Sequence, residues 1–404
     1  MYKKLIFTII ILIFSLNVFS NELEMNGYLE NYTGIILDNG DFSILQNTLN
    51  LKFKRSGSIG NVYANPVIYN NQLNENLDII LREAYLDMYF DDFDLRIGKQ
   101  QIVWGKADGV FITDIISPRN LKEFILPEFE EIRLGVNALK FDYYKNSSTF
   151  EFIWMPYFES AKLPDSNSIW FPEMSLKLPF EDINYKNTEM ESNFKNSEFA
   201  LKYSSLNEMM DFEIMGGYLW DDTLVNQITK NENNSITLNS EYKRMGVIGG
   251  SVGKEISGVI LRSELAYYLN RSFQSLDLKV NGISEKNSIN SMIGFDYNIK
   301  GVDFSTQFIN TYISNYEDSI VNDETDTTLT LNIVEKFLRD TLTTQMFIYY
   351  GFNENDMLVK PKLSYDFSDG LVLYLGANMF VGDNGQFGQF DKNDMIYSKI
   401  RYSF

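Results

Sequence analysis

Apolar and polar side chains alternate along almost the whole chain after residue 20. In Val359–Phe367, Val, Pro, Leu, Tyr and Phe fall on one face, whereas Lys, Lys, Ser and Asp fall on the other. Val259–Leu269 and Ile396–Phe404 repeat this pattern. A period of two residues places successive side chains on opposite faces of a β-strand. The chain is therefore predicted to be all-β, with strands that each bury one face.

The connections between the predicted strands alternate in length. Short polar turns, such as Lys300-Gly301, alternate with mostly longer connections, such as 105–130 and 159–196. This layout is typical of a transmembrane, antiparallel, up-and-down β-barrel with long extracellular loops and short periplasmic turns, here of about 18 strands, or about 16 if one hairpin is miscounted. A soluble β-sandwich or propeller is less favoured, because it would contain more than the 8 Pro and 25 Gly present.

Residues 1–20 are predicted to form a secretory signal peptide. Lys3 and Lys4 precede an apolar run, and Ser20 suits cleavage before Asn21. A membrane anchor is less favoured, because the apolar run is shorter than the roughly 20 residues that span a bilayer. Residues 21–404 are expected to form one domain.

The last predicted strand ends in Phe404, with apolar side chains at most alternate positions before it. This ending is typical of the signal that the bacterial outer-membrane assembly machinery binds. Together with the signal peptide, it predicts a location in the bacterial outer membrane, in contact with its lipid.

The composition excludes several classes of function. The chain contains no Cys and no His, which removes Ser-His-Asp triads and the commonest zinc ligand. An enzyme based on carboxylates alone would need a close pair of acids, and Glu128, Glu130 and Glu131 are more typical of a solvated loop. No enzymatic activity, cofactor or metal is therefore predicted. The net charge of −20, or −22 after the leader with Lys3 and Lys4 is removed, disfavours nucleic acid as a partner.

A barrel of this size encloses a water-filled lumen, so its inward side chains should be polar and of both signs. Lys360, Lys362, Lys399 and Arg401 are predicted on the two strands that flank 371–381. They could form a track for anions, or a basic ladder that only stiffens the wall, and the ladder is favoured. The residues predicted to line the pore or its constriction are Arg96, Lys106, Asp108, Arg119, Arg133, Lys202, Arg262, Glu264, Lys360, Lys362, Asp366, Lys399 and Arg401.

The alternation fails in segment 105–130. Gly105 and Gly109 allow a sharp turn, and Phe111 and Ile112 are too apolar for an exposed loop. The segment is therefore predicted to fold inward and constrict the pore. A loop that caps the barrel or contacts a neighbouring protomer is the alternative.

Two details of this region are also predicted. The strand before the segment is expected to cover Arg96–Val103, which would place Trp104 in the aromatic belt at its extracellular end. Leu121–Leu126 is expected to form a short helix within the segment.

Three short motifs in this part of the chain resemble a known family. Arg82–Asp87 reads REAYLD, Arg96–Asp108 contains GKQ followed by WG, and Ser117–Asn120 stands in place of an NP-D turn. These motifs resemble those of bacterial outer-membrane barrels described as porins or as relatives of alginate-export channels. The turn departs from that pattern, with Ser and Asn where the family usually has Asn and Asp. The resemblance implies that a solute passes across the outer membrane.

The predicted function is a porin-like channel for the diffusion of small hydrophilic or charged solutes, with selectivity set by lumen charges and by 105–130. Two alternatives stay open: a specific exporter or importer of a polymer or amphiphile, and a surface-exposed structural or adhesive barrel. A homotrimer also stays open, because an apolar face that contacts lipid has the same composition as one that contacts a protomer.

Overall fold

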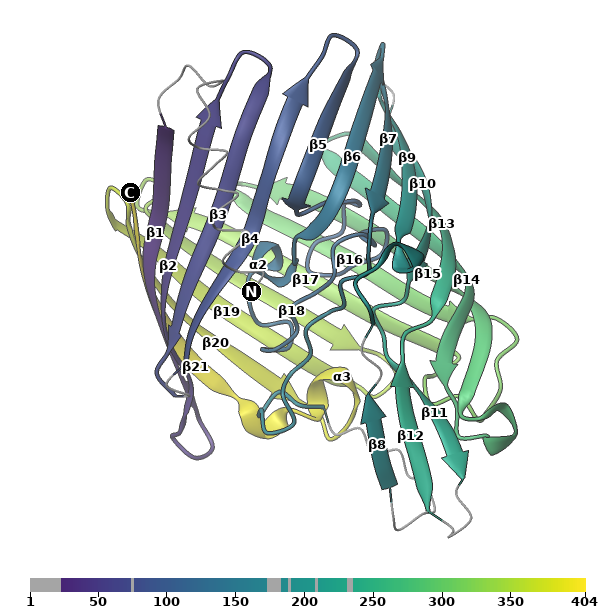
Figure 1. Ribbon diagram of the computed structural model, residues 1–404. Coiled ribbons are helices and arrows are strands. Elements are labelled where there is room, and N and C mark those ends of the chain that lie inside the picture. Colours follow the sequence, from purple (N-terminus) through teal and green to yellow (C-terminus); the bar gives the residue numbers. More distant parts are fainter. Residues whose placement is uncertain (1–22, 74–75, 173–182, 188–189, 208–209, 231–234) are drawn as a thin grey trace.

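The computed structural model describes residues 23–73, 76–172, 183–187, 190–207, 210–230 and 235–404. The predicted signal peptide, residues 1–20, lies outside the described residues. The described chain forms a closed, 18-stranded antiparallel sheet with almost no helix (Figure 1). This confirms the predicted all-β, up-and-down barrel and its count of 18 strands.

The wall strands pair with their neighbours along the chain, and β1 also pairs with β21 to close the ring. They are β1 (Leu23–Ile36), β2 (Phe42–Ser56), β3 (Gly60–Asn71), β4 (Asn76–Tyr89), β5 (Phe93–Gln100), β6 (Val136–Lys145), β7 (Ser148–Met155), β9 (Glu198–Leu206), β10 (Asp211–Trp220), β13 (Arg244–Ile256), β14 (Val259–Gln274), β15 (Ile283–Ile299), β16 (Val302–Ile313), β17 (Thr325–Phe337), β18 (Leu342–Gly351), β19 (Asp356–Ser368), β20 (Leu371–Val381) and β21 (Met395–Ser403).

The remaining elements lie in the connections. A separate three-stranded sheet, drawn below the barrel in Figure 1, contains β8 (Ile183–Asn187), β11 (Val225–Lys230) and β12 (Ile236–Glu241). The helices are short: α2 (Phe129–Ile132), α3 (Gly385–Gly388) and the 3-10 turns η1 (Phe194–Asn196), η2 (Leu278–Val280) and η3 (Asp391–Asn393). Within the described residues, none of these has both the length and the apolar character of a membrane-spanning helix.

The register of the closing strands shows how alternation separates the two faces of the wall. Leu29 lies opposite Tyr402, and both side chains are about half exposed on the outer face, at 51% and 50%. The next pair, Glu30 and Arg401, lies on the inner face and forms an ion pair at 2.7 Å. On these two strands, the period-two pattern in the sequence therefore separates outward from inward side chains.

Two local predictions are wrong at the start of segment 105–130. The strand expected over Arg96–Val103 ends at Gln100, because the next backbone N–H, that of Gln101, donates to the side chain of Glu83 at 2.9 Å. Trp104 is consequently not in an outer aromatic belt. It is only 1% exposed, and its indole N–H donates to Glu151 inside the barrel.

The predicted helix over Leu121–Leu126 is also wrong. The backbone N–H of Leu121 donates to the carbonyl of Lys162 at 2.7 Å, and Phe124 has a φ of 55°, outside the range of a right-handed helix. Pro127 disfavours helical geometry at the residue before it. The helix in this region is α2, which begins two residues after the proline.

Closure of the barrel depends on a close approach at Gly27. Its N–H and C=O groups bond to Phe404, each at 3.0 Å, and a Cβ at this position would lie 2.1 Å from the carbonyl oxygen of Asn50. We expect G27A to push β1 from β2 and to lower the stability of the barrel by about 1–3 kcal/mol, the usual cost of overpacking. The measurement is the temperature at which the refolded protein loses its compact, fast-migrating form in SDS electrophoresis.

The matched control is G246A on β13, where the nearest atom to a new Cβ is 3.4 Å away. It should unfold close to the temperature of the unsubstituted protein. Equal unfolding temperatures for G27A and G246A would contradict the role assigned to Gly27.

Candidate functional site

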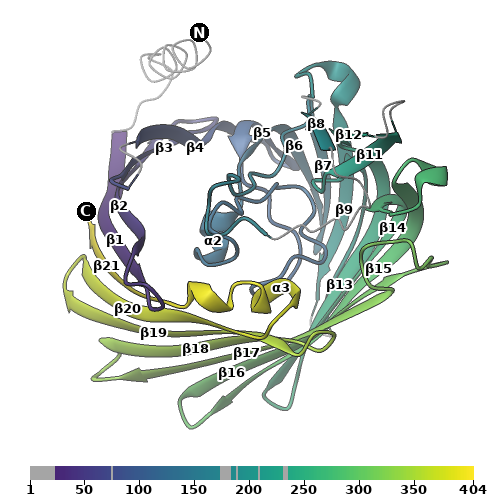
Figure 2. The same cartoon turned by 90° about the horizontal axis from the view of Figure 1, so that it is seen from below.

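The connection between β5 and β6, residues 101–135, lies inside the ring of strands (Figure 2). We call it the inner segment. Its Asp108 N–H donates to the side chain of Gln307 on β16 at 2.9 Å, and Lys360 on β19 donates to its Ile125 carbonyl at 3.1 Å. The inner segment therefore reaches across the lumen to strands far from the two that it connects.

A buried carboxylate on β14 anchors the first turn of the inner segment. Glu264 is 2% exposed and accepts hydrogen bonds from the backbone N–H groups of Lys106, Ala107 (2.7 Å) and Thr113 (3.1 Å). The Thr113 hydroxyl also donates to it, at 2.6 Å. Gly105 turns the chain here with a φ of 88°. One carboxylate thus satisfies four donors, through charge-assisted hydrogen bonds of the stronger kind.

Arg262 lies two residues before Glu264 on the same inward face of β14. It binds hydrogen-bond acceptors of this turn, whereas Glu264 binds donors. Its guanidinium donates to the carbonyl of Lys106 and to the carboxylates of Asp108 and Asp296, the last two at 2.7 Å each. Asp296 belongs to the neighbouring strand β15. Lys106, Asp108, Arg262 and Glu264, all predicted to line the pore, are therefore brought together by the fold.

The apolar part of the inner segment packs against small and apolar residues of the wall. Trp104, Ile112 and Ile116 are each at most 4% exposed and belong to one cluster with wall residues such as Met155 and Val247. This packing explains why a connection rich in isoleucine stays inside the barrel. Burial of each such side chain contributes about 1.5–3 kcal/mol.

Arg133 and Arg119 are held within the inner segment itself. Arg133 forms a buried ion pair with Asp114 at 2.5 Å, and its guanidinium lies 4.2 Å from the centre of the Phe129 ring. Burial raises the pKa of Asp114 above its ordinary value, although Arg133 opposes that shift. Arg119 lies over the ring of Phe111 at 5.3 Å.

The four cations on β19 and β21 contact the acidic side of the inner segment and its surroundings. Lys360 donates to backbone carbonyls of the segment, including that of Leu126 at 3.2 Å, and Lys362 pairs with Glu128 at 2.9 Å. Arg401 lies 3.5 Å from Glu131 in addition to its bond with Glu30. Lys399 lies 4.3 Å from the ring centre of Tyr32. Three of the four therefore have partners on the inner segment.

The ion pair with Lys362 stabilises the charged form of Glu128. Burial by itself would raise the pKa of Glu128, but Lys362, with help from Lys399 and Lys360, lowers it below its ordinary value. The carboxylate is therefore stably ionised at neutral pH and keeps the inner segment attached to β19.

The other predicted site residues lie on wall strands. Arg96 of β5 pairs with Asp87 of β4 at 2.6 Å, and Lys202 of β9 lies 3.6 Å from Glu151 of β7. Asp366 is exposed on β19. None of these three contacts the inner segment through an ion pair within the described part of the chain.

A second stretch of chain, residues 156–172 after β7, packs against the inner segment. Lys162 exchanges backbone hydrogen bonds with Arg119 (2.8 Å) and Leu121 (2.7 Å). Trp170 is 5% exposed and packs against aromatic side chains of β20 and the β20–β21 connection, such as Phe380 and Phe390. The alternation of short and long connections predicted this stretch, as part of 159–196, to be an extracellular loop, although its bulky apolar side chains were a signal of burial.

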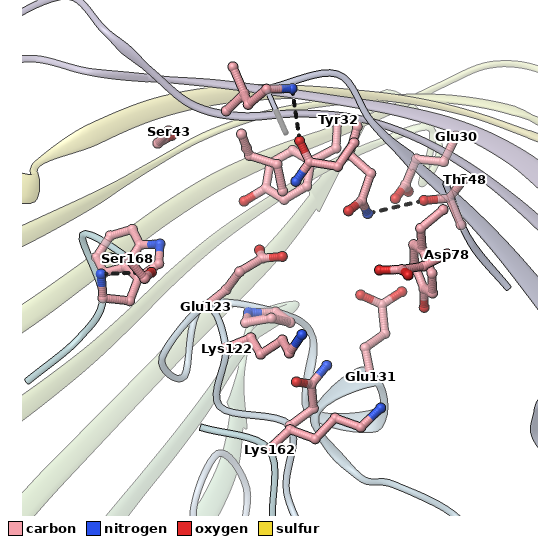
Figure 3. Close-up of a pocket in the computed structure, with 18 of the residues that line it drawn as sticks. Glu30, Tyr32, Ser43, Thr48, Asp78, Lys122, Glu123, Glu131, Lys162 and Ser168 are labelled. Carbon is pink, nitrogen blue, oxygen red and sulfur yellow. Dashed lines mark hydrogen bonds between the residues drawn. The ribbon is translucent and has the colours of Figure 1, made fainter. Parts of the chain in front are cut away.

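A cavity of about 700 Å³ remains between these two inner stretches and the wall formed by β1–β4 and β21 (Figure 3). Side chains of both charge signs line it, together with three tyrosines. Its charged lining residues are Glu30, Asp78, Arg82, Lys122, Glu123, Glu131, Lys162, Asp165 and Lys399.

Sequence reasoning missed most of these lining residues. Arg82 lies at an irregularity in the β3–β4 register between Asn65 and Pro66, which the alternation could not reveal. Lys122 and Lys162 lie in stretches without any period. Among the described residues, no group of three or more acidic side chains is arranged to hold a metal ion.

The anchor at Glu264 leads to a prediction. E264A leaves the buried N–H group of Thr113 and the partly buried N–H groups of Lys106 and Ala107 without their acceptor, at up to about 1–3 kcal/mol for each group. We expect the first turn of the inner segment to open more often while the wall stays folded. Hydrogen–deuterium exchange of peptides that cover 105–113 should accelerate by at least about tenfold, which corresponds to about 1.4 kcal/mol.

E285A is the matched control, because Glu285 is exposed on β15 and forms no ion pair within the described residues. It should leave exchange in 105–113 unchanged. Unaltered exchange in E264A as well would show that the turn does not depend on this carboxylate.

The fold is similar to three crystal structures of bacterial proteins. They are Acinetobacter baumannii OccAB3 (TM-score 0.55, 10% identity, 95% of this chain and 99% of that chain covered), the outer membrane protein opdK from Pseudomonas aeruginosa (0.55, 9%, 95% and 99%) and P. aeruginosa OccK2 (OpdF) in complex with glucuronate (0.54, 8%, 96% and 98%). At these identities the similarity shows a shared barrel fold.

No curated protein matches the sequence. Residues 54–404 match a family described as protein of unknown function (DUF1302), and this stretch is most of the 404-residue chain. The barrel described above is therefore that of a DUF1302 protein, and the chain belongs to this family.

Proposed function

We propose that this protein is a porin-like channel of the bacterial outer membrane, through which small hydrophilic or charged solutes diffuse. The observation that carries the proposal is the polar cavity of about 700 Å³ beside the inner segment, inside a closed ring of 18 strands. An apolar outer face and a polar interior are what a transmembrane barrel requires. The fold shared with the outer membrane protein opdK, and with OccK2 in complex with glucuronate, supports this function.

In this proposal the inner segment constricts the pore. Its contacts with β14, β16, β18 and β19 leave the cavity on the side of β1–β4, so solutes would pass along that wall. The cations of β19 and β21 then position the segment rather than form an open track for anions, because Lys360, Lys362 and Arg401 already bind it. In the proposed orientation of the barrel, the short turns face the periplasm and the long loops face the outside of the cell.

The proposal includes no enzymatic activity, because the chain has neither His nor Cys to serve as base or nucleophile. Binding of Phe404 by the assembly machinery, signal-peptide cleavage near Ser20 and a homotrimer remain predictions. Passage of a polymer or amphiphile and a structural or adhesive role are the alternatives, and the described structure holds no observation that favours either over the channel.

Planar-bilayer recording tests the channel and its constriction together. The purified protein should give discrete conductance steps, and deletion of Phe111–Pro127 should increase their size several-fold, because the deletion removes 17 of the 35 residues of the inner segment from the lumen. Heat modifiability in SDS electrophoresis shows whether the deleted barrel folds.

No steps from folded wild-type protein would overturn the channel. Steps of equal size in the folded deletion variant would leave the channel in place and overturn the constriction.

Selectivity should depend on pH through Glu123. Burial inside the barrel raises the pKa of this carboxyl group to about 7, with Lys399 of β21 opposing the shift and Glu131 of α2 adding to it. A raised carboxyl pKa means that the group is neutral below about pH 7 and charged above it. The cavity therefore gains a negative charge between pH 6 and pH 8. We expect the preference for cations, measured as a reversal potential in a salt gradient, to increase over that interval.

E123Q should remove most of this pH dependence, because the amide is neutral throughout. E130Q is the matched control, since Glu130 is exposed on α2 and does not line the cavity. A pH response in E123Q as large as that of E130Q would contradict the assignment.

A further inference from the structure

We propose that the cavity beside β1–β4 selects zwitterionic solutes, small molecules that carry an ammonium group and a carboxylate. This inference rests on the channel function proposed above and adds the class of substrate. The charged side chains of the cavity differ in whether they already have a partner of opposite charge and in where they lie.

Four cations in the cavity have no carboxylate within 4 Å among the described residues: Arg82, Lys122, Lys162 and Lys399. Lys122 and Lys162 are exposed to the cavity and lie on two stretches of chain joined by the backbone hydrogen bonds at Leu121. Partial burial and the neighbouring cations Lys122 and Lys99 lower the pKa of Lys162, and the carboxylates of Asp78 and Glu159 oppose this shift. Two lysines that repel each other beside a cavity form a binding site, because the carboxylate of a solute between them would reduce their repulsion.

Acidic side chains line the same cavity. Glu30 and Glu131 both depend on one guanidinium, that of Arg401, and Asp78 on β4 has no ion pair within the described chain. In Figure 3, Glu30 and Asp78 extend from the wall strands, whereas Lys122, Glu131 and Lys162 extend from the inner stretches. This acidic group offers oxygen atoms to an ammonium group of a solute.

The lysines and the acidic side chains together disfavour solutes that carry charge of only one sign. An anion that binds at the lysines also meets the carboxylates, and a cation at the carboxylates also meets the lysines, so each is repelled by part of the lining. A zwitterion can place each charge beside its opposite. The cavity volume of about 700 Å³ is within the range that binds small molecules.

Lys399 is held at the wall, although its charge also acts on Glu123. It is 8% exposed and lies 4.3 Å from the ring centre of Tyr32 on the neighbouring strand β1. Its contact with the ring directs it to the wall, which leaves the paired lysines of the inner stretches as the main site for a carboxylate.

The experiment measures block of single-channel current by three probes of matched length: 4-aminobutyrate (zwitterion), 4-hydroxybutyrate (anion) and 4-amino-1-butanol (cation). We expect the zwitterion to block at a concentration about tenfold lower than either ion. The double variant K122Q/K162Q should weaken block by the zwitterion and by the anion about tenfold but spare the cation. D78N should weaken block by the zwitterion and the cation but spare the anion.

K279Q is the control, because Lys279 lies in η2 outside the cavity lining. The three probes should block the K279Q channel at the same concentrations as the unsubstituted channel. Conductance steps without preference for the zwitterion, or with unchanged block in K122Q/K162Q, overturn the substrate class and leave the channel intact. Folded protein without steps overturns the channel and this proposal with it.

Discussion

The structure depends on the need to pair every backbone N–H and C=O group of the wall. In a membrane no water is available for these groups, so a sheet must close on itself. Closure here joins β1 to β21 and brings Gly27 against Phe404. A ring of 18 strands is too wide to be filled by its own side chains, and the chain therefore has to supply material for the lumen or leave it to water.

The inner segment supplies that material, and two kinds of force hold it. Its apolar residues pack on the wall around Trp104, whereas its polar backbone is satisfied by the side chains of Glu264 and Arg262. Cations of β19 and β21 bind its acidic side. Because all these contacts lie away from β2 and β3, the open volume is left along that part of the wall, and its polar lining is the basis of the proposed channel.

The fold was predictable because its signal is local. Each strand shows its own period of two, so the number of strands and their inward faces could be derived without knowledge of neighbours. The failures lie where the backbone bonds to side chains or to distant chain. Gln101 leaves the wall because Glu83 accepts its N–H, and Leu121 avoids a helix because its N–H donates to Lys162. Arg82 lines the cavity next to an irregularity in strand register that no periodic pattern shows.

The sequence by itself determined the barrel, a count of about 18 strands, the two faces of its regularly alternating strands and the inventory of charges available for a site. Only the tertiary structure decided which of those charges are already paired. Lys362 and Glu128 are 234 residues apart, and Lys106 and Glu264 are 158 apart, so their contacts depend on how the ring closes. Electrostatic attraction decreases with distance in space, and spacing along the chain does not set that distance. The lysines that keep facing the cavity could therefore be identified only after the fold was known.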